Sequence, residues 1–274
     1  FGRLGAEMGR ESIVRMPLVE LAQVQARVAG LEWADASPIL WAQRFVKSPA
    51  EVARIHHICQ ITSDAFEALP ASLKIGDTER DACRKLRIDL LARGADTTPY
   101  MPGISGPGGY DQIIVGPTDR VLGDGDVLII DTGTTYDGYF CDFDRNFAFG
   151  HLDDAAARAH DAVWLATEAG IAAARPGATC EDVWAVMAKV LEDAGSIGNN
   201  VGRMGHGLGL QLTEPPSNTK GDQTELVPGA VLTIEPGMEY APGKMIVHEE
   251  NLVITEDGAE LLSRRAPREM PVIA

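Results

Sequence analysis

Residues 127–142 read Val-Leu-Ile-Ile-Asp-Thr-Gly-Thr-Thr-Tyr-Asp-Gly-Tyr-Phe-Cys-Asp, and this stretch decides the fold. The aliphatic run ending at Asp131 predicts a buried β-strand, and the aromatic residues before Asp142 predict a second strand after a tight turn. Two carboxylates on neighbouring strands repel each other when both are ionised, so a proton or a cation must accompany them. Carboxylate oxygens suit divalent metal ions. The hairpin therefore predicts a metal site.

Two further ligand candidates lie downstream, His206 and Glu235. His206 is part of Gly-His-Gly-Leu-Gly at residues 205–209, where glycines let the backbone approach closely and leave the ring facing open space. Glu235 ends an aliphatic strand and precedes Pro-Gly, so a turn presents it as Asp131 is presented. Both residues are predicted metal ligands.

A last candidate, Glu249, interrupts an apolar strand predicted over residues 245–255. A buried strand accepts such a charge only when the charge is paired. The alternation of side chains along a strand puts Glu249 and His248 on opposite faces. Glu250 shares the face of His248 and is the second choice for this ligand.

Together the candidates supply four carboxylates and one imidazole, which is too rich in carboxylates for a structural zinc site. The set fits two divalent ions about 3.5–4 Å apart, bridged by carboxylates and a hydroxide, which is hydrolytic chemistry. Our hypothesis is that Asp142 and Glu249 bridge, that Asp131 chelates one ion, and that His206 and Glu235 bind the other. Mn, Fe, Co and Zn all accept such donors, so the sequence does not identify the metal.

The composition is that of an ordinary soluble globular protein, with 274 residues, 45% of them hydrophobic and 23% charged. A net charge of −16 argues against a general role in binding nucleic acid or an anionic membrane. No apolar run is long enough to span a bilayer. The four cysteines are scattered, without the spacing of a disulfide framework or a thiolate zinc site, and this favours a cytoplasmic protein.

Two domains are predicted, with a boundary near residue 47. Residues 1–46 mix short helical pieces with loops and are too few for an independent domain, so they are interpreted as the C-terminal remnant of a preceding domain. The second domain, residues 47–274, opens with a helix for which Ser48 and Glu51 form a capping box and Pro49 takes the first helical position.

The second domain shows the order helix, helix, strands twice, which predicts a duplicated α+β unit. The predicted helices cover residues 49–69, 77–94, 154–174 and 180–194, and the later strands cover residues 207–213, 230–235, 245–255 and 259–263. Glycines and prolines crowd residues 98–110, which predicts an irregular loop. That loop is either a simple connector or a border of the pocket.

Six motifs along residues 42–265 carry a family resemblance. They are Arg44-Phe-Val-Lys-Ser-Pro-Ala-Glu51, the stretch Pro-Thr-Asp-Arg-Val-Leu-Gly-Asp-Gly-Asp-Val-Leu-Ile-Ile-Asp-Thr-Gly at 117–133, Asp142-Phe-Asp-Arg145, Gly205-His-Gly-Leu-Gly209, Thr233-Ile-Glu-Pro-Gly237 and Glu249-Glu-Asn-Leu-Val-Ile-Thr-Glu-Asp-Gly258. The chain resembles the pita-bread (M24-type) metallopeptidases, namely methionine aminopeptidase, aminopeptidase P and prolidase, with creatinase as a metal-free relative. The aminopeptidase P and prolidase type, the Xaa-Pro peptidases, is the nearest.

The resemblance implies an α+β pita-bread fold with pseudo-twofold duplicated helix-helix-sheet units. It implies that residues 1–46 end a creatinase-type N-terminal domain, and that the protein is a homodimer. It also implies two divalent ions (Mn, Co, Zn or Fe) bound by the five predicted ligands. Glu235 is then the expected proton shuttle, and His206 the other catalytic residue.

Three positions depart from the peptidase pattern. Ile114 lies nearest the place of a family His that helps to bind the scissile amide, Thr213 replaces a second His, and Val247 replaces an Arg. An isoleucine cannot donate a proton, and a threonine hydroxyl is neither acid nor base near neutral pH. Tyr110 or Asp111 is the predicted stand-in for the missing His. Tyr110, Ile114 and Thr213 are the predicted substrate-binding residues.

Three functions are consistent with this pattern. The first is a metallohydrolase resembling Xaa-Pro peptidases, in which a metal-bridging hydroxide attacks the amide carbonyl of a small peptide. The alternative is a relative that has diverged to a small amide or other non-peptide substrate, like ectoine-type hydrolases, creatinase or sulfoniopropionate lyases. A non-catalytic pita-bread binding protein is the third, and retention of all five ligands disfavours it.

Overall fold

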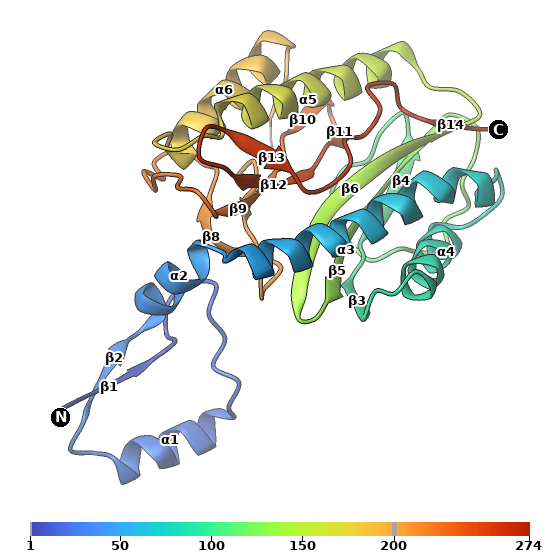
Figure 1. The fold of residues 1–274 in the computed structure, drawn as a ribbon. Coiled ribbons are helices and arrows are strands. Elements are labelled where there is room, and N and C mark those ends of the chain that lie inside the picture. The colour runs from blue at the N-terminus through green and yellow to red at the C-terminus, as the bar shows by residue number, and fades with distance from the viewer. Residues whose placement is uncertain (1, 199–201) are drawn as a thin grey trace.

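The computed structural model describes residues 2–198 and 202–274. Figure 1 shows two helix-covered sheets that together form one body, and an N-terminal segment that projects from it. The first sheet has the order β14-β6-β5-β3, with β4 also paired to β5. Its strands are β3 (Thr97–Tyr100), β4 (Gly103–Pro107), β5 (Asp126–Tyr136), β6 (Tyr139–Phe149) and β14 (Val272–Ile273). Asp137 and Gly138 join β5 to β6 with positive φ angles of 49° and 81°, the backbone that a two-residue hairpin requires.

The prediction of an irregular loop over residues 98–110 is wrong, because β3 and β4 both pair with β5 there. Two of the glycines serve close packing within a strand. A Cβ atom on Gly103 would lie 2.5 Å from Cys83 Sγ, and one on Gly106 would lie 2.3 Å from Gly109 O. Glycine is therefore required here by the neighbours of the strand rather than by a turn.

The second sheet has the order β13-β12-β9-β7-β8. Its strands are β7 (His206–Gly207), β8 (Glu214–Ser217), β9 (Val231–Ile234), β12 (Glu250–Ile254) and β13 (Ala259–Leu261), and a separate hairpin contains β10 (Gly237–Ala241) and β11 (Lys244–Val247). Two of the strands predicted from the sequence differ in their bounds from the observed strands. The strand predicted over 207–213 is confined to β7, and the one predicted over 245–255 is divided at residues 248 and 249. The chain changes partner there, since β11 pairs with β10 whereas β12 pairs with β9.

Helices cover the outer side of both sheets (Figure 1). They are α3 (Pro49–Ala68), the 3₁₀ helix η1 (Leu69–Ser72), α4 (Glu79–Ala92), α5 (Asp154–Ala173) and α6 (Cys180–Asp193). The capping box predicted at Ser48 is present, and two more are formed at Thr78 and Thr179. The helix α3 packs on β5 and β6, whereas α5 packs on β9, β10 and β11. The predicted order of helix, helix, strands therefore occurs twice.

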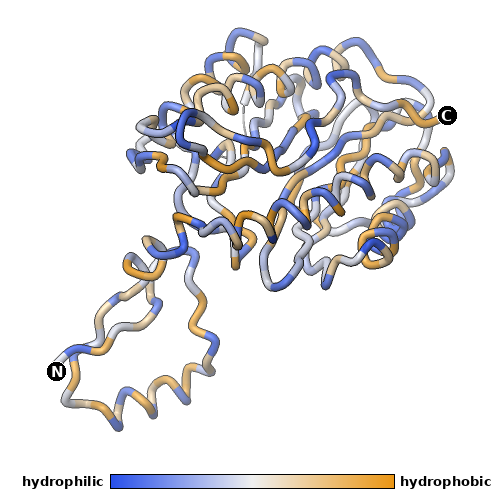
Figure 2. Tube along the Cα trace, in the orientation of Figure 1, coloured by the Kyte–Doolittle hydropathy of each residue, from blue (hydrophilic) through white to orange (hydrophobic). Residues whose placement is uncertain are grey.

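The structure has two apolar cores, one centred on each half, and each also contains residues of the other half, such as Val231 in the first core and Ile129 in the second. Apolar residues of α3 and α4 pack against β5 and β6, and those of α5 and α6 pack against the second sheet and the β10–β11 hairpin. In Figure 2 apolar and polar residues alternate along the helices, as expected for helices that bury one face. Among the described helices, none combines the length and the hydropathy that crossing a membrane requires.

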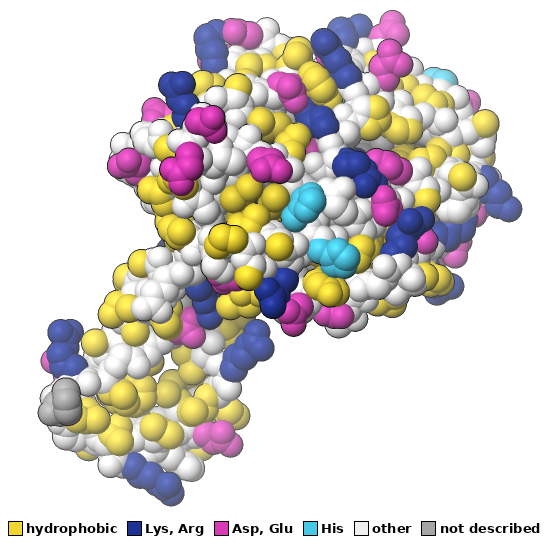
Figure 3. Space-filling model, viewed as in Figure 1, with side chains coloured by type: hydrophobic (Ala, Val, Ile, Leu, Met, Phe, Trp, Pro, Cys, Tyr) yellow, Lys and Arg dark blue, Asp and Glu magenta, His cyan; other side chains and the backbone are white. Residues whose placement is uncertain are grey.

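The N-terminal segment consists of β1 (Arg3–Ala6), α1 (Leu18–Arg27), β2 (Glu32–Asp35) and α2 (Ser37–Phe45), with β1 and β2 parallel. No residue of α1 is buried, and Leu18 is 82% exposed. Figure 3 shows hydrophobic side chains spread over this projecting segment. The interpretation of residues 1–46 as part of a preceding domain stays a prediction.

A buried ion pair fastens the start of α3 to β8. Lys47 Nζ lies 3.1 Å from Glu214 Oε2, and the two side chains are 3% and 1% exposed. Burial lowers the pKa of Lys47, whereas the carboxylate of Glu214 raises it. The Gln211 N–H also donates to Glu214, at 3.1 Å. The pair is therefore a charged contact that water does not screen.

Replacing Lys47 with methionine is expected to lower the free energy of unfolding by about 3–5 kcal/mol, because Glu214 would remain buried without a countercharge. The double variant Lys47→Met/Glu214→Gln removes both charges and keeps an acceptor for Gln211, so it should recover most of the loss. Urea unfolding of both variants measures this. Equal destabilisation in the single and double variants would contradict the argument.

Candidate metal centre

The hairpin brings its acidic residues to one face. In the β5–β6 ladder Asp131 is paired with Asp144 and Gly133 with Asp142, so the three carboxylates project from the same side of the sheet. A Cβ atom on Gly133 would lie 2.2 Å from Leu212 Cδ1. Glycine at that position lets the Leu212 side chain close in beside the carboxylates.

Backbone and side-chain contacts fix the orientation of His206. Gly205, with a φ of +116°, brings the chain so near Thr233 that a Cβ atom would lie 2.1 Å from its carbonyl oxygen. The His206 N–H then donates to Thr233 Oγ1 at 3.1 Å. The ring Nδ1 lies 2.9 Å from Gly207 O, which only accepts, so Nδ1 carries the proton. Nε2 therefore keeps a free lone pair that can bind a metal ion, and it lies 3.5 Å from Asp142 Oδ2.

The two glutamates come from the second half of the chain and line the same cleft as Asp131, although Asp131 and Glu235 lie outside the closest group of ligand atoms. Glu235 follows β9 and is held there by its N–H, which donates to Met204 O at 3.1 Å. Glu249 lies where the chain leaves β11 and enters β12. One ligand atom each of Asp142, His206 and Glu249 lie within 4.8 Å of one another. The first half of the fold therefore supplies Asp131 and Asp142, and the second half supplies the other three predicted ligands.

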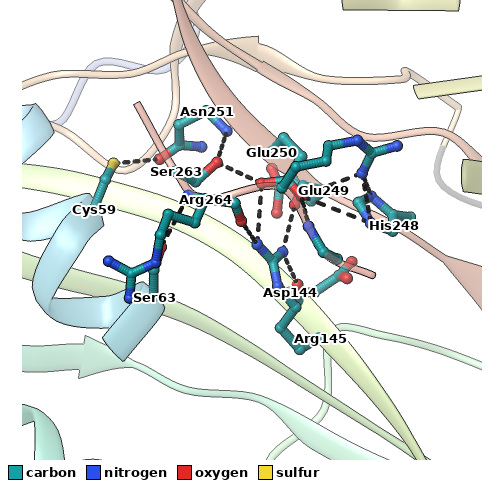
Figure 4. Close-up of polar contacts among 12 residues, drawn as sticks. Cys59, Ser63, Asp144, Arg145, His248, Glu249, Glu250, Asn251, Ser263 and Arg264 are labelled. Atoms are coloured by element: carbon teal, nitrogen blue, oxygen red, sulfur yellow. Dashed lines mark hydrogen bonds and ion pairs between the residues drawn. The ribbon is translucent and has the colours of Figure 1, made fainter. Parts of the chain in front are cut away.

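Glu250, the second choice for the last ligand, lies on the opposite side of β12 (Figure 4). It accepts hydrogen bonds from Arg145 Nη2 at 3.1 Å and from the Ser263 hydroxyl. The first choice, Glu249, is the one that joins the cluster.

Burial dominates the electrostatics of the cluster. It raises the pKa of Asp142 to about 8. Burial and the neighbouring carboxylates also raise the pKa of Asp131, Glu235 and Glu249. Burial and then the positive charge of Arg203 lower the pKa of His206 to about 4, so its imidazole is neutral. Four carboxylates therefore share a space in which they cannot all ionise without a cation.

The cluster also contains oxygen atoms without partners. Asp131 Oδ1, Asp142 Oδ1 and Glu249 Oε1 are buried and have no hydrogen-bond partner among the described residues. A buried carboxylate oxygen without a donor costs free energy that a bound cation restores. Unpaired oxygens and a neutral imidazole are what a divalent ion requires, so these residues fit a divalent metal site.

A cleft of about 960 Å³ opens over the cluster. Ile114 and Thr213, two of the predicted substrate-binding residues, both line it. Ile114 is 76% exposed, whereas Thr213 Oγ1 lies 3.4 Å from Arg203 Nη2, which donates to it.

Tyr110, the third predicted substrate-binding residue, does not line the cleft. Its side chain is 2% exposed, and its hydroxyl donates to Asn146 Oδ1 at 2.9 Å and accepts from the Val247 N–H at 2.7 Å. The phenol thus joins β6 to β11 inside the core. Asp111 is exposed and likewise absent from the cleft wall. Neither residue is positioned to replace the missing imidazole.

Two residues of the cleft wall were not singled out from the sequence, Tyr100 and Arg203. Burial raises the pKa of Tyr100, so its hydroxyl keeps its proton, and it donates a hydrogen bond that lowers the pKa of Asp131. Arg203 lowers the pKa of Asp142 by its charge. The position of Arg203, three residues before His206, was the available signal, since it is a lone cation among glycines.

Comparisons with known proteins agree with this geometry. Residues 53–256 match the model of metallopeptidase family M24. The probable dipeptidase PepE of Mycobacterium tuberculosis is 34% identical over 240 residues, which cover 87% of this chain and 63% of that protein. This chain therefore spans less than two thirds of the length of that relative.

Solved structures of similar proteins have the same fold as this chain. The dipeptidase PepE from Mycobacterium ulcerans superimposes with a TM-score of 0.86 at 32% identity, covering 94% of this chain and 69% of that one. The X-Pro aminopeptidase from Thermotoga maritima gives a TM-score of 0.84 at 26% identity, covering 94% and 73%. The predicted α+β pita-bread fold is confirmed.

Proposed function

This chain belongs to metallopeptidase family M24, and we propose that it forms the catalytic part of a metal-dependent hydrolase that cleaves short peptides in the manner of Xaa-Pro peptidases. The observation that carries the proposal is the convergence of acidic residues and one neutral imidazole, with unpaired buried oxygens, on the floor of a cleft. The relatives named as dipeptidase and X-Pro aminopeptidase support the same reaction class.

The proposed ligands are Asp131, Asp142, His206, Glu235 and Glu249, which hold two divalent ions (Mn, Co, Zn or Fe). When bound, the ions polarise a substrate carbonyl and activate water for attack. The carboxylates and the His206 imidazole would hold the ions, and the Gly207 carbonyl keeps the His206 ring turned with Nε2 toward Asp142.

Glu235 is the proposed proton shuttle. Burial and the neighbouring acids raise the pKa of its carboxyl group, which is the direction that favours its taking up a proton. It takes the proton from the attacking water and gives it to the leaving amine. The hydroxyls of Tyr100 and Thr213 are donors on the wall, and they orient the substrate amide.

One observation favours a second candidate, a small amide or other non-peptide substrate. In the described part of the chain, the cleft wall offers no imidazole besides His206, and the apolar, exposed Ile114 lies on that wall. A substrate that needs no further imidazole for its amide would suit such a wall.

A turnover assay with added Mn²⁺ or Co²⁺ separates the two candidates. Release of proline from Xaa-Pro dipeptides, abolished by a chelator, supports the peptidase. Turnover of a small cyclic amide or osmolyte without peptide turnover supports the second candidate. Stoichiometric metal without turnover of either class would refute both and point to a binding protein.

Arg203 would fix the orientation of the proposed peptide in the cleft. Its guanidinium is anchored by Thr213, and Nη1 lies 3.8 Å from Glu11 Oε1 at the mouth of the cleft. The side chain is 30% exposed, so it faces the cleft rather than the core. We propose that Arg203 binds the carboxylate of a short peptide, which displaces Glu11.

Replacing Arg203 with glutamine is expected to raise KM for a free-acid dipeptide about tenfold or more, because a charge-assisted hydrogen bond is lost. The corresponding dipeptide amide should show little change. Lys220→Gln is the matched control, since Lys220 is a second cation of the same cleft but is exposed. Steady-state kinetics on the metal-loaded protein measure both variants. An equal rise in KM for acid and amide would contradict the assignment.

A further inference from the structure

A second cavity lies behind the metal cluster, on the helix-covered side of the sheets. Its volume is about 210 Å³. It is enclosed by the second half of α3, by β6, by α5 and by the C-terminal segment 264–271. None of the five proposed metal ligands lines it. Figure 4 shows part of its polar wall, with Arg145 and His248 directed toward Glu250.

A buried carboxylate lies directly behind the wall. Glu250 is fully buried and accepts four hydrogen bonds. The donors are Arg145 Nη2 at 3.1 Å, Arg265 Nη1 at 3.2 Å, the Ala266 N–H at 2.9 Å and the Ser263 hydroxyl. Arg145 also donates to the carbonyl oxygens of Asp144, Glu249 and Arg264, so its Nη atoms are fully engaged, whereas Arg265 Nη2 makes a single bond, to Trp164 O.

The two least exposed charged side chains that line the cavity, Arg145 and Arg265, are both cationic. Their guanidinium groups are 10% and 16% exposed and share the buried carboxylate of Glu250, and Arg145 also acts by its charge on the buried Asp144. Glu168, the other partner of Arg265, is 45% exposed, where water screens its charge. An anion in the cavity would meet a field that favours it.

His160 supplies a polar group without a partner. It lines the cavity, is 4% exposed, and neither ring nitrogen has a hydrogen-bond partner among the described residues. The Pro267 carbonyl lies close enough to raise the pKa of His160, although no hydrogen bond to it is formed. His248, by contrast, is satisfied, since its Nε2 accepts from Arg265 at 2.9 Å and its Nδ1 lies 3.3 Å from Thr167 Oγ1. A buried ring nitrogen left unpaired calls for a ligand or a water.

Much of the remaining lining is apolar, although Ser63, Glu67 and Arg264 also contribute to it. Phe66 and Phe147 come from α3 and β6, and Pro70 and Pro271 complete the surface. We propose that the cavity is a binding site for a small carboxylate with a compact apolar body, whose charge faces Arg145 and His160 and whose body packs on the phenylalanines. A bulky or doubly charged anion would not suit a largely apolar space of this size.

Such a ligand would lie one strand away from the metal cluster. Arg145 Nη1 donates to the carbonyl oxygen of Glu249 at 3.1 Å, and Asn146 Nδ2 donates to that of Val247 at 2.7 Å. Both donors line the cavity. The occupant therefore contacts the residues that hold the backbone on either side of Glu249.

Benzoate is a suitable probe, with benzamide as a neutral isostere. Calorimetric titration of the full, metal-loaded chain is expected to show saturable binding of benzoate, and binding of benzamide at least about tenfold weaker. Ala266→Leu fills the cavity and keeps the backbone N–H that bonds Glu250, so it should weaken benzoate binding by a similar factor. Metal content and urea unfolding establish that this variant is folded.

Hydrogen exchange of the unmodified chain gives a second measurement, independent of any variant. Benzoate should slow exchange in residues 140–149 and 262–271 and leave residues 97–107 unchanged. If benzoate binds Ala266→Leu as tightly as it binds the unmodified chain, its site lies outside the cavity, for example at the metal ions. This result would overturn the proposal. Equal binding of benzamide, or no saturation up to about 10 mM benzoate, would also overturn it.

Discussion

Replacing Asp142 with asparagine is expected to lower turnover by about three orders of magnitude or more and to leave the protein without its full complement of metal. Asp142 is one of three residues whose ligand atoms lie within 4.8 Å of one another, and its Oδ1 is buried and unpaired. An amide of the same shape carries no charge, so it binds a divalent ion weakly and cannot bridge two of them. Metal analysis and kcat of the purified variant measure both losses.

Asp144→Asn is the matched control for this variant. Asp144 is two residues along the same strand, faces the same side, is 2% exposed and also has a buried Oδ1 without a partner, but it neither lines the cleft nor belongs to the group of ligand atoms that lie within 4.8 Å of one another. It should retain its metal and most of its activity. If Asp142→Asn keeps a full complement of metal, the assignment of the ligands is wrong. If Asp144→Asn loses metal equally, the cluster extends beyond the five residues.

Removing the metal is expected to reverse the pH dependence of stability between about pH 6.5 and about pH 8. The folded-state pKa of Asp142 is raised to about 8, well above its usual value, and burial shifts Asp131, Glu235 and Glu249 in the same direction. A raised folded-state pKa contributes stability at low pH that is lost as the pH rises through it. Asp142 alone should therefore cost the metal-free protein about 1.6 kcal/mol across this interval.

The metal-loaded protein should behave in the opposite way, because ions bind the deprotonated ligands. His160 and His206 act in the other direction: their folded-state pKa is about 4, but in the unfolded chain they are half protonated at about pH 6.5, so each adds about 0.4 kcal/mol of stability across the interval. This contribution is the same with and without metal and cancels when the two forms are compared. Urea unfolding with chelator and with added Mn²⁺, at both pH values, measures the effect. A chelated protein that is more stable at the higher pH would contradict it.

The sequence was sufficient for the hairpin and the ligand motifs because a buried metal site has a local signature. Asp131 and Glu235 each end an aliphatic run, and Glu249 interrupts one. A charge in such a place requires a partner, so the chemistry can be inferred without the fold. Resemblance then supplied the architecture, which the helices, both sheets and the comparisons confirm.

What could not be predicted depends on partners that are distant in the chain. The break at residues 248 and 249 exists because β11 and β12 pair with different strands. Tyr110 was a reasonable substrate contact by position, but the Val247 N–H and the Asn146 amide draw its hydroxyl into the core. The role of Arg203 became visible only beside Thr213 and Glu11. Contacts between residues that are distant in the chain produce no periodic pattern in the sequence, so the sequence could not predict them.

The distribution of the ligands between the two halves has a consequence for folding. Asp131 and Asp142 lie on the first sheet, whereas His206, Glu235 and Glu249 lie on or beside the second. The bound ions would then act as a removable cross-link that closes a chain loop of many residues, and such closure limits the conformational entropy of the unlinked halves. Because both apolar cores contain residues of each half, the ions would reinforce a cooperativity that packing already provides, and the two halves should still melt together when the metal is withdrawn.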